Sequence, residues 1–74
     1  MGGKASTITN TVKDARKAAG LSQQALGSAV GVTRQTVIAL EANRYAPSLE
    51  LAFRLSRTLG VPVETLFQFS GSWD

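Results

Sequence analysis

Residues 23–43 read QQALGSAVGVTRQTVIALEAN, and this stretch decides the fold. Apolar residues recur in it at the three- and four-residue spacing of two amphipathic helices. Those that we expect to fill the shared core are Leu26, Val30, Val32, Val37 and Leu40. Gly31 separates the two patterns, and a glycine there favours a turn because it adopts left-handed torsions at low cost. The spacing therefore predicts two helices that cross at a steep angle through a tight turn.

Single residues around the turn indicate where these two helices begin, cross and end. Ser22 and Thr33 precede them, and each hydroxyl can accept a hydrogen bond from a first-turn N–H. Gly27 stands at the expected crossing, where a missing side chain lets the backbones approach, although glycine inside a helix costs roughly 0.5 to 1 kcal/mol relative to alanine. Asn43 tolerates left-handed torsions, so we expect the second helix to stop there.

A further helix is predicted upstream, over residues 8–19. The apolar residues that recur there at helical spacing are Ile8, Val12, Ala15 and Ala19. Ser6 or Thr7 can cap its start, and Gly20 can end it.

Two more helices are predicted downstream. Ser48 caps the first, over residues 49–59, and Gly60 ends it. We expect its inward side chains to be Leu49, Ala52, Leu55 and Leu59. Pro62 then introduces a short last segment that runs to residue 67.

No strand pattern is long enough to indicate a sheet, so we expect an all-α protein, a compact five-helix bundle with short connections. Residues 1–6 form an N-terminal arm, and residues 7–67 form the domain. Residues 68–74 form a C-terminal tail that is flexible or dimer-forming, because Ser and Gly there favour flexibility.

Composition excludes several classes of function. Seventy-four residues suffice for one small domain and not for a multidomain enzyme. The chain has no Cys and no His, which removes thiol and imidazole nucleophiles and the usual zinc ligands, so we expect no metal and no cofactor. No apolar run approaches the roughly 20 residues that span a bilayer, and we expect a soluble cytoplasmic protein with no membrane partner.

The net charge of +3 is unevenly distributed. Residues 1–57 hold all eight Lys and Arg but three of the five acidic residues, a net charge of +5, and the last 17 residues carry −2. A basic domain attracts polyanions, so nucleic acid is the first partner to consider. The alternative is a surface that is basic for solubility alone.

The stretch 23–43 resembles the helix-turn-helix of the lambda-repressor and Cro-type family, also called the Xre family. The resemblance rests on a small residue at 27, a glycine at 31 and the apolar residues given above, and it extends over roughly residues 8–67. It implies an ion pair between Arg16 and Glu41, with two solvated charges as the alternative. The chain departs from the family in having Ala42-Asn43 where Asn-Gly is common, and Pro62 where a capping Ser or Asp is common.

The resemblance also implies that the recognition helix, residues 33–42, lies in the major groove of double-stranded DNA. At about 100° per residue, the outward side chains of this helix, with that of Ala42 among them, lie on one side of it. The base-reading candidates are Arg34, Gln35, Ile38 and Ala39. Arg34 can pair with guanine and Gln35 with adenine, and Ile38 can contact a thymine methyl or be an ordinary exposed apolar residue.

A second group of residues is expected at phosphates. By the same resemblance, these are Gln23, Thr33, Thr36, Arg44 and Tyr45. Phosphate contacts position a protein on DNA without specifying its sequence. Tyr45 has an alternative role as a core residue beneath the loop.

One recognition helix reads only a few base pairs, so we expect a homodimer on two half-sites one helical turn apart. The C-terminal segment carries more apolar residues than it needs for itself. The candidates for the dimer interface are Val63, Leu66, Phe67, Phe69 and Trp73. The alternative is that Leu66 and Phe67 cover the monomer core and the tail is loose.

We interpret the chain as a non-enzymatic, sequence-specific transcriptional regulator, most simply a repressor. An antitoxin or a restriction-system controller uses the same module and has a toxin or another protein as its partner. A protein-binding adaptor is the alternative from another class, because fold alone does not fix function. The carboxylates are scattered over different helices and no nucleophile stands beside a base, which argues against an enzyme.

Overall fold

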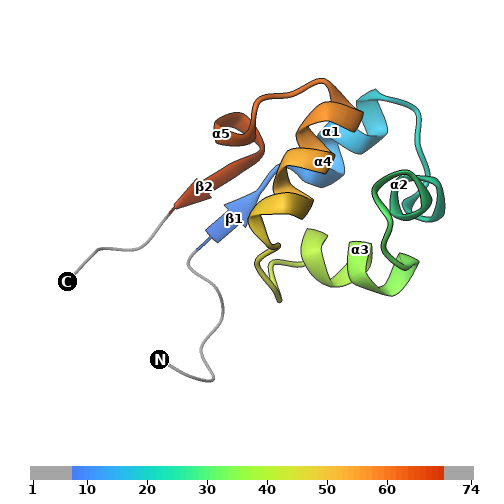
Figure 1. Ribbon diagram of the computed structural model, residues 1–74, viewed down its shortest axis with the longest axis horizontal. Helices are drawn as coiled ribbons and strands as arrows, with labels where there is room; N and C mark the ends of the chain where they lie inside the picture. The colour runs from blue at the N-terminus through green and yellow to red at the C-terminus, as the bar shows by residue number, and fades with distance from the viewer. Residues whose placement is uncertain (1–7, 70–74) are drawn as a thin grey trace.

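The computed structural model describes residues 8–69, which form five helices and two short strands (Figure 1). In chain order the elements are β1 (Ile8–Asn10), α1 (Val12–Ala18), α2 (Gln23–Val30), α3 (Arg34–Glu41), α4 (Leu49–Leu59), α5 (Val63–Leu66) and β2 (Phe67–Phe69). The two strands lie at one end of the molecule and α2 at the other, with α3 along the lower side of the view. The mostly helical, compact fold agrees with the expectation.

The two strands correct the all-α prediction. β1 pairs antiparallel with β2, so that Ile8 lies opposite Phe69 and Asn10 lies opposite Phe67. The backbone N–H of Thr11 donates to the Leu66 carbonyl at 2.9 Å and extends the pairing toward α5. Strands of three residues are too short to show an alternating pattern, and their partners are far apart in the sequence, so no local signal reveals them.

The first helix is shorter than expected, because α1 begins at Val12 rather than near Ile8. Asn10 explains the difference: its Oδ1 accepts the Val12 N–H at 3.1 Å, while its Nδ2 donates to the Leu40 carbonyl at 2.8 Å and to Asn43 Oδ1 at 2.9 Å. These bonds hold the chain before α1 against the end of α3. Ile8 therefore lies in β1 instead of the first turn of a helix.

Most helix boundaries follow the predicted signals. The hydroxyls of Ser22, Thr33 and Ser48 accept backbone N–H groups at the starts of α2, α3 and α4. Asn43 has a positive φ of 59° after α3, which makes it the left-handed stop that the sequence predicts. Pro62 precedes α5 and offers no side-chain cap.

The core lies between the helices and beneath the strands. Its buried apolar side chains are Val12, Leu26, Val30, Val37, Leu40, Leu51, Ala52, Leu55 and Leu66. Leu49 was expected to point inward, but it is 72% exposed, and Leu51 is buried in its place. Leu49 fits the helical spacing of the inward residues, but it is the first residue of α4, and its side chain is exposed at the N-terminal end of that helix.

The crossing of α2 and α3 requires Gly27. A Cβ built on Gly27 would lie 2.8 Å from the carbonyl oxygen of Val32 and 3.3 Å from the carbonyl group of Thr33. The backbone of the turn thus occupies the space that any side chain would need. This close approach fixes the orientation of α3 on the rest of the domain.

Candidate nucleic-acid interface

Helix α3 presents a face whose polar side chains are available to a ligand. Val37 and Leu40 point into the core, while Arg34 and Gln35 are exposed at the opposite side of the first turn. Neither the Arg34 nor the Gln35 side chain makes a hydrogen bond or ion pair with another residue in the described range. Their donors can therefore bind an external partner without breaking a bond inside the protein.

The remaining outward residues of α3 complete this face. Ile38 and Ala39 are half-buried, and Ala42 is exposed beyond the last turn. The structure thus places the four base-reading candidates on one side of one helix, as the helical repeat predicts. Small and apolar side chains beside Arg34 and Gln35 leave room for a flat surface such as a base edge.

Two threonines lie at the N-terminus of α3. The Oγ1 atoms of Thr33 and Thr36 are 3.1 Å apart, and Thr33 Oγ1 also accepts the Thr36 N–H at 3.2 Å. Thr33 is exposed, and the first-turn N–H groups of an eight-residue helix point outward beside it. Hydroxyls and N–H groups at this end suit an anion, because the helix dipole is positive there.

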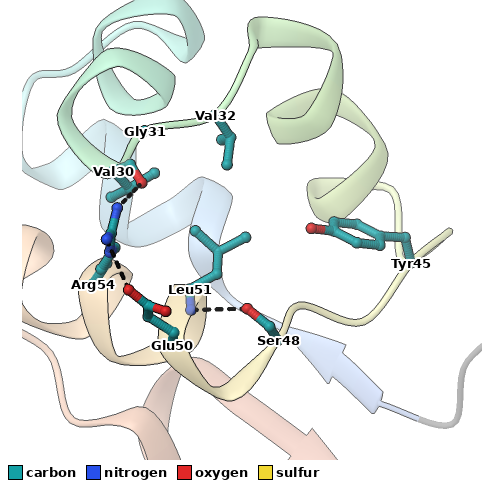
Figure 2. Close-up of a pocket in the computed structure, with 8 residues that line it drawn as sticks. All are labelled: Val30, Gly31, Val32, Tyr45, Ser48, Glu50, Leu51 and Arg54. Atoms are coloured by element: carbon teal, nitrogen blue, oxygen red, sulfur yellow. Dashed lines mark hydrogen bonds and ion pairs between the residues drawn. The ribbon is translucent and has the colours of Figure 1, made fainter.

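Tyr45 follows α3 in the loop and separates two shallow hollows. One, of about 320 Å³, is lined by Gln35, Thr36, Ala39 and Tyr45. Figure 2 shows the other, of about 260 Å³, which lies between Tyr45, the turn after α2 and the start of α4. The Tyr45 side chain is 38% exposed, so it is neither a buried core residue nor fully solvated. It stands beside α3 with exposed Arg44 next to it.

Arg54 closes the far side of the hollow in Figure 2. Its Nη1 donates to the Val30 carbonyl at 3.3 Å, and its Nη2 lies 2.8 Å from Glu50 Oε2. A cation at the C-terminal carbonyls of α2 is favourable, because the dipole is negative there. Sequence spacing does not reveal the bond of Arg54 to Val30, since that carbonyl lies on another helix.

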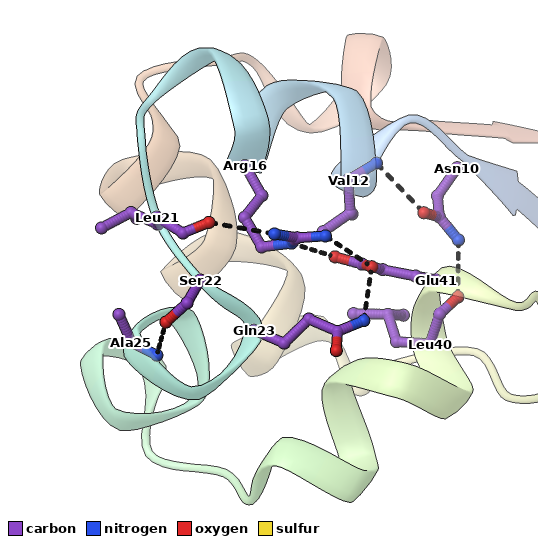
Figure 3. Close-up of polar contacts among 9 residues, drawn as sticks. All are labelled: Asn10, Val12, Arg16, Leu21, Ser22, Gln23, Ala25, Leu40 and Glu41. Carbon is purple, nitrogen blue, oxygen red and sulfur yellow. Dashed lines mark hydrogen bonds and ion pairs between the residues drawn. The ribbon is translucent and has the colours of Figure 1, made fainter.

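The ion pair that the resemblance implied is present and buried (Figure 3). Arg16 Nε lies 2.7 Å from Glu41 Oε2, Arg16 Nη2 lies 3.2 Å from Glu41 Oε1, and the two side chains are 9% and 5% exposed. Arg16 Nη1 also donates to the Leu21 carbonyl at 3.0 Å. The pair joins α1 to the last residue of α3, so it sets how α3 sits on the domain.

Both ionised forms are favoured in this pair. The hydrogen bond to Glu41 raises the pKa of Arg16 above its ordinary value, against the opposing effect of burial. Burial alone would raise the pKa of Glu41, but hydrogen bonds from Arg16 and Gln23, with the charges of Arg16 and Lys13, lower it. The bidentate geometry therefore compensates the desolvation of the two charges.

Gln23 is part of the same network. Its Nε2 donates to Glu41 Oε1 at 3.1 Å, so its amide is engaged inside the protein rather than free at the surface. Gln23 is the first residue of α2 and remains half-exposed. A phosphate at this position would accept from the second hydrogen of Gln23 Nε2 and from the N–H groups of the first turn of α2.

The candidate dimer residues differ in how far they are buried. Leu66 is 0% exposed and belongs to the core, so it has no surface to offer, and its assignment to an interface is wrong. Val63 and Phe67 are half-buried, and Phe69 is 40% exposed in β2. Trp73 lies outside the described residues. The segment carries more apolar residues than it needs for itself partly because one of them, Leu66, packs in the core of the domain.

Within residues 8–69, no three His, Cys, Asp or Glu side chains come together as a metal site would require. In the same range, no helix combines the length and apolar character needed to cross a membrane. The described cations outside the ion pairs stand mainly on α1, α3, the loop after α3 and the end of α4.

Comparison with known proteins identifies the architecture. A family model described as helix-turn-helix matches residues 12–66, from the first residue of α1 to the last of α5. An uncharacterized HTH-type transcriptional regulator of Methanothermobacter thermautotrophicus is 57% identical over 49 residues, which cover 66% of this chain and 71% of that protein. The uncharacterized HTH-type transcriptional regulator YgzD of Bacillus subtilis is 47% identical over 60 residues, 81% of this chain and 91% of its own length. A regulator with the same description from Methanocaldococcus jannaschii is 43% identical over the same shares.

Proposed function

The chain belongs to the helix-turn-helix family, and from this membership we propose that it is a sequence-specific, non-enzymatic DNA-binding regulator of transcription. Its simplest action is repression, by occupying a two-fold symmetric operator as a homodimer. The observation that carries the proposal is the outward face of α3, where the side chains of Arg34 and Gln35 are exposed and make no hydrogen bond or ion pair with any other described residue.

In this proposal α3 lies in the major groove with its N-terminal turn at the base edges. Arg34 donates to guanine O6 and N7, and Gln35 pairs with adenine N6 and N7. Ile38 and Ala39 lie against thymine methyl groups. Both are half-buried and project little from the helix, so the longer side chains of Arg34 and Gln35 can reach the bases.

The phosphate contacts lie at both ends of this face. Thr33 and Thr36 bind a phosphate at the N-terminus of α3, together with its first-turn N–H groups. Arg44 and Tyr45 bind the backbone beyond its C-terminus, and Gln23 binds the strand that α2 crosses. The ion pair of Arg16 with Glu41 contacts no DNA but holds α3 in place.

The size of the relatives supports a homodimer. YgzD and the M. jannaschii protein are covered over 91% of their lengths, so they consist almost entirely of this one domain. A regulator of that size has one recognition helix, and two copies double the number of base pairs read.

The test is selection of binding sites from random duplex DNA at roughly 0.15 M salt, where non-specific attraction is weakened. We expect a two-fold symmetric site with half-sites about 34 to 36 Å apart. Arg34→Ala should weaken binding to this site by roughly tenfold or more and relax preference at one position of each half-site. Lys17→Ala, at an exposed cation on α1, is the matched control and should keep the base preference.

The outcome separates this function from the alternatives. DNA binding without any enriched sequence would contradict the proposal, and loss of all binding would favour a protein-binding adaptor. An antitoxin or a restriction-system controller would pass the same DNA test and would differ only in having a toxin or another protein as a second partner.

A further inference from the structure

The exposed apolar side chains of the described residues are concentrated away from α3. Four large ones are exposed, and three of them, Leu49, Phe53 and Phe69, are 72%, 54% and 40% exposed. Leu49 and Phe53 are four residues apart on α4, so they are neighbours on its surface. The fourth, Tyr45, lies beside α3 and lines hollows with polar residues.

A hollow of about 330 Å³ joins these side chains into one surface. It lies between the start of α4, the loop before it and the strand ends, and every side chain that lines it is apolar. Its wall includes Ile8, Pro47, Leu49, Ala52, Val63 and Phe67. Phe69 is two residues beyond Phe67 and opposite Ile8, so its side chain is on the same side of the sheet. We call the hollow with Leu49, Phe53 and Phe69 the apolar end-face.

We propose that the apolar end-face is where a second copy of this chain binds, with Leu49 and Phe53 as the central contacts. This inference rests on the proposed function, which requires two copies. It assigns the interface to α4 and the hollow beside the sheet, where the sequence had pointed to the C-terminal segment alone.

The area of the end-face fits a dimer contact. The exposed parts of Leu49, Phe53 and Phe69 together offer about 300 Å² of apolar surface, the size of patch that marks interaction sites on small proteins. A standard interface takes about 800 Å² from each partner, about a sixth of the 4874 Å² surface of this chain. The apolar walls of the hollow belong to the same surface and add to this area.

The position of the end-face agrees with DNA binding by two copies. The strands lie at the opposite end of the molecule from α2, and no base-reading candidate lines the hollow (Figure 1). A partner at this end leaves the outward side chains of α3 uncovered. The two α3 helices then lie on either side of the contact, as two half-sites require.

The test compares the molar mass of the parent chain with that of Leu49→Gln/Phe53→Gln, without DNA, by sedimentation equilibrium. We expect the parent to have twice its monomer mass of 7.8 kDa and the double variant to dissociate, with Kd for self-association raised by roughly tenfold or more. Thr58→Gln introduces the same side chain at an exposed position on the same helix and should keep the parent mass.

Each other outcome overturns the inference. A monomeric parent at tens of micromolar, a double variant with the parent mass, or a Thr58→Gln variant that dissociates as readily would each do so. If circular dichroism shows the double variant unfolded, the single Leu49→Gln decides, because Leu49 is the most exposed of the three. Site selection with the parent tests the DNA function separately, so either proposal can fail alone.

Discussion

At the scale of single residues, Gly27 has the tightest steric constraint, because the Val32 carbonyl oxygen occupies the place of a side chain. Gly27→Ala should lower the free energy of unfolding by about 1 to 3 kcal/mol, since the clash exceeds the gain of about 0.5 to 1 kcal/mol in helix propensity. Urea denaturation measures the change. Ser28→Ala, on the exposed side of the same helix, is the control and should leave stability within about 0.5 kcal/mol. A Gly27→Ala variant as stable as the parent would show that the turn can shift.

The two carboxylates Glu41 and Glu50 offer a matched pair of substitutions. Glu41→Gln leaves Arg16 buried without its counter-charge and should cost about 3 kcal/mol or more of stability. Glu50→Gln breaks the exposed pair with Arg54 and should cost at most about 1 kcal/mol. Equal losses for the two variants in urea denaturation would contradict the view that burial makes the difference.

The same pair predicts a dependence of stability on pH. Because the pKa of Glu41 in the folded protein is below its ordinary value of 4.5, its contribution is fully present above that value. The contribution is lost as the pH falls through the lower folded pKa. The parent should therefore lose more stability than Glu41→Gln between about pH 5 and about pH 3. The other carboxylates are common to both proteins, so parallel curves would contradict this origin.

Individual residues were foreseeable where a local rule governs them. The caps at Ser22, Thr33 and Ser48 and the left-handed Asn43 follow from their own chemistry. The partners of Asn10 and Arg54 could not be foreseen, since each binds a carbonyl on a distant element. The pairing of Arg16 with Glu41 followed from the family resemblance and not from spacing.

At the scale of elements, α2 and α3 carry equivalent hydroxyl caps with different expected roles. Ser22→Ala and Thr33→Ala should each cost about 1 kcal/mol of stability, because each leaves a first-turn N–H without its acceptor. Thr33→Ala should also raise Kd for the operator by severalfold, since we place Thr33 at a phosphate. Titrations at a temperature where both variants are fully folded measure this. Equal Kd values for the two variants would remove Thr33 from the contact.

Helices and strands differed in how far the sequence revealed them. The bounds of α2, α3 and α4 follow from periodicity with a cap at one end and a stop at the other. The strands became visible only in the folded chain, because Ile8 pairs with a residue near the other end of the described range. The hollow between α4 and the sheet could not be predicted for the same reason, because residues far apart in the sequence line it. Leu49 is one of them.

At the scale of the whole molecule, DNA affinity should depend on salt through the basic first three quarters of the chain. Each phosphate that a cation neutralises contributes about 0.9 to the slope of log Kd against log salt concentration. Arg44→Gln should lower this slope by about 0.9 for each copy bound and leave the selected sequence unchanged. Lys17→Gln, which removes a cation from α1, should keep the slope. A slope unaffected by Arg44→Gln would place that side chain away from the DNA.

The pairing of β1 with β2 also sets the order in which the domain can be completed during synthesis. Ile8–Asn10 leaves the ribosome early, but its partner strand, Phe67–Phe69, is translated 59 positions later. The crossing of α2 with α3 is local, so the face that we propose for DNA binding can assemble on a nascent chain whose sheet has not yet formed. The apolar end-face includes both strands, so it is completed last. Self-association through this surface, as we propose it, therefore requires that each chain has been translated at least as far as Phe69.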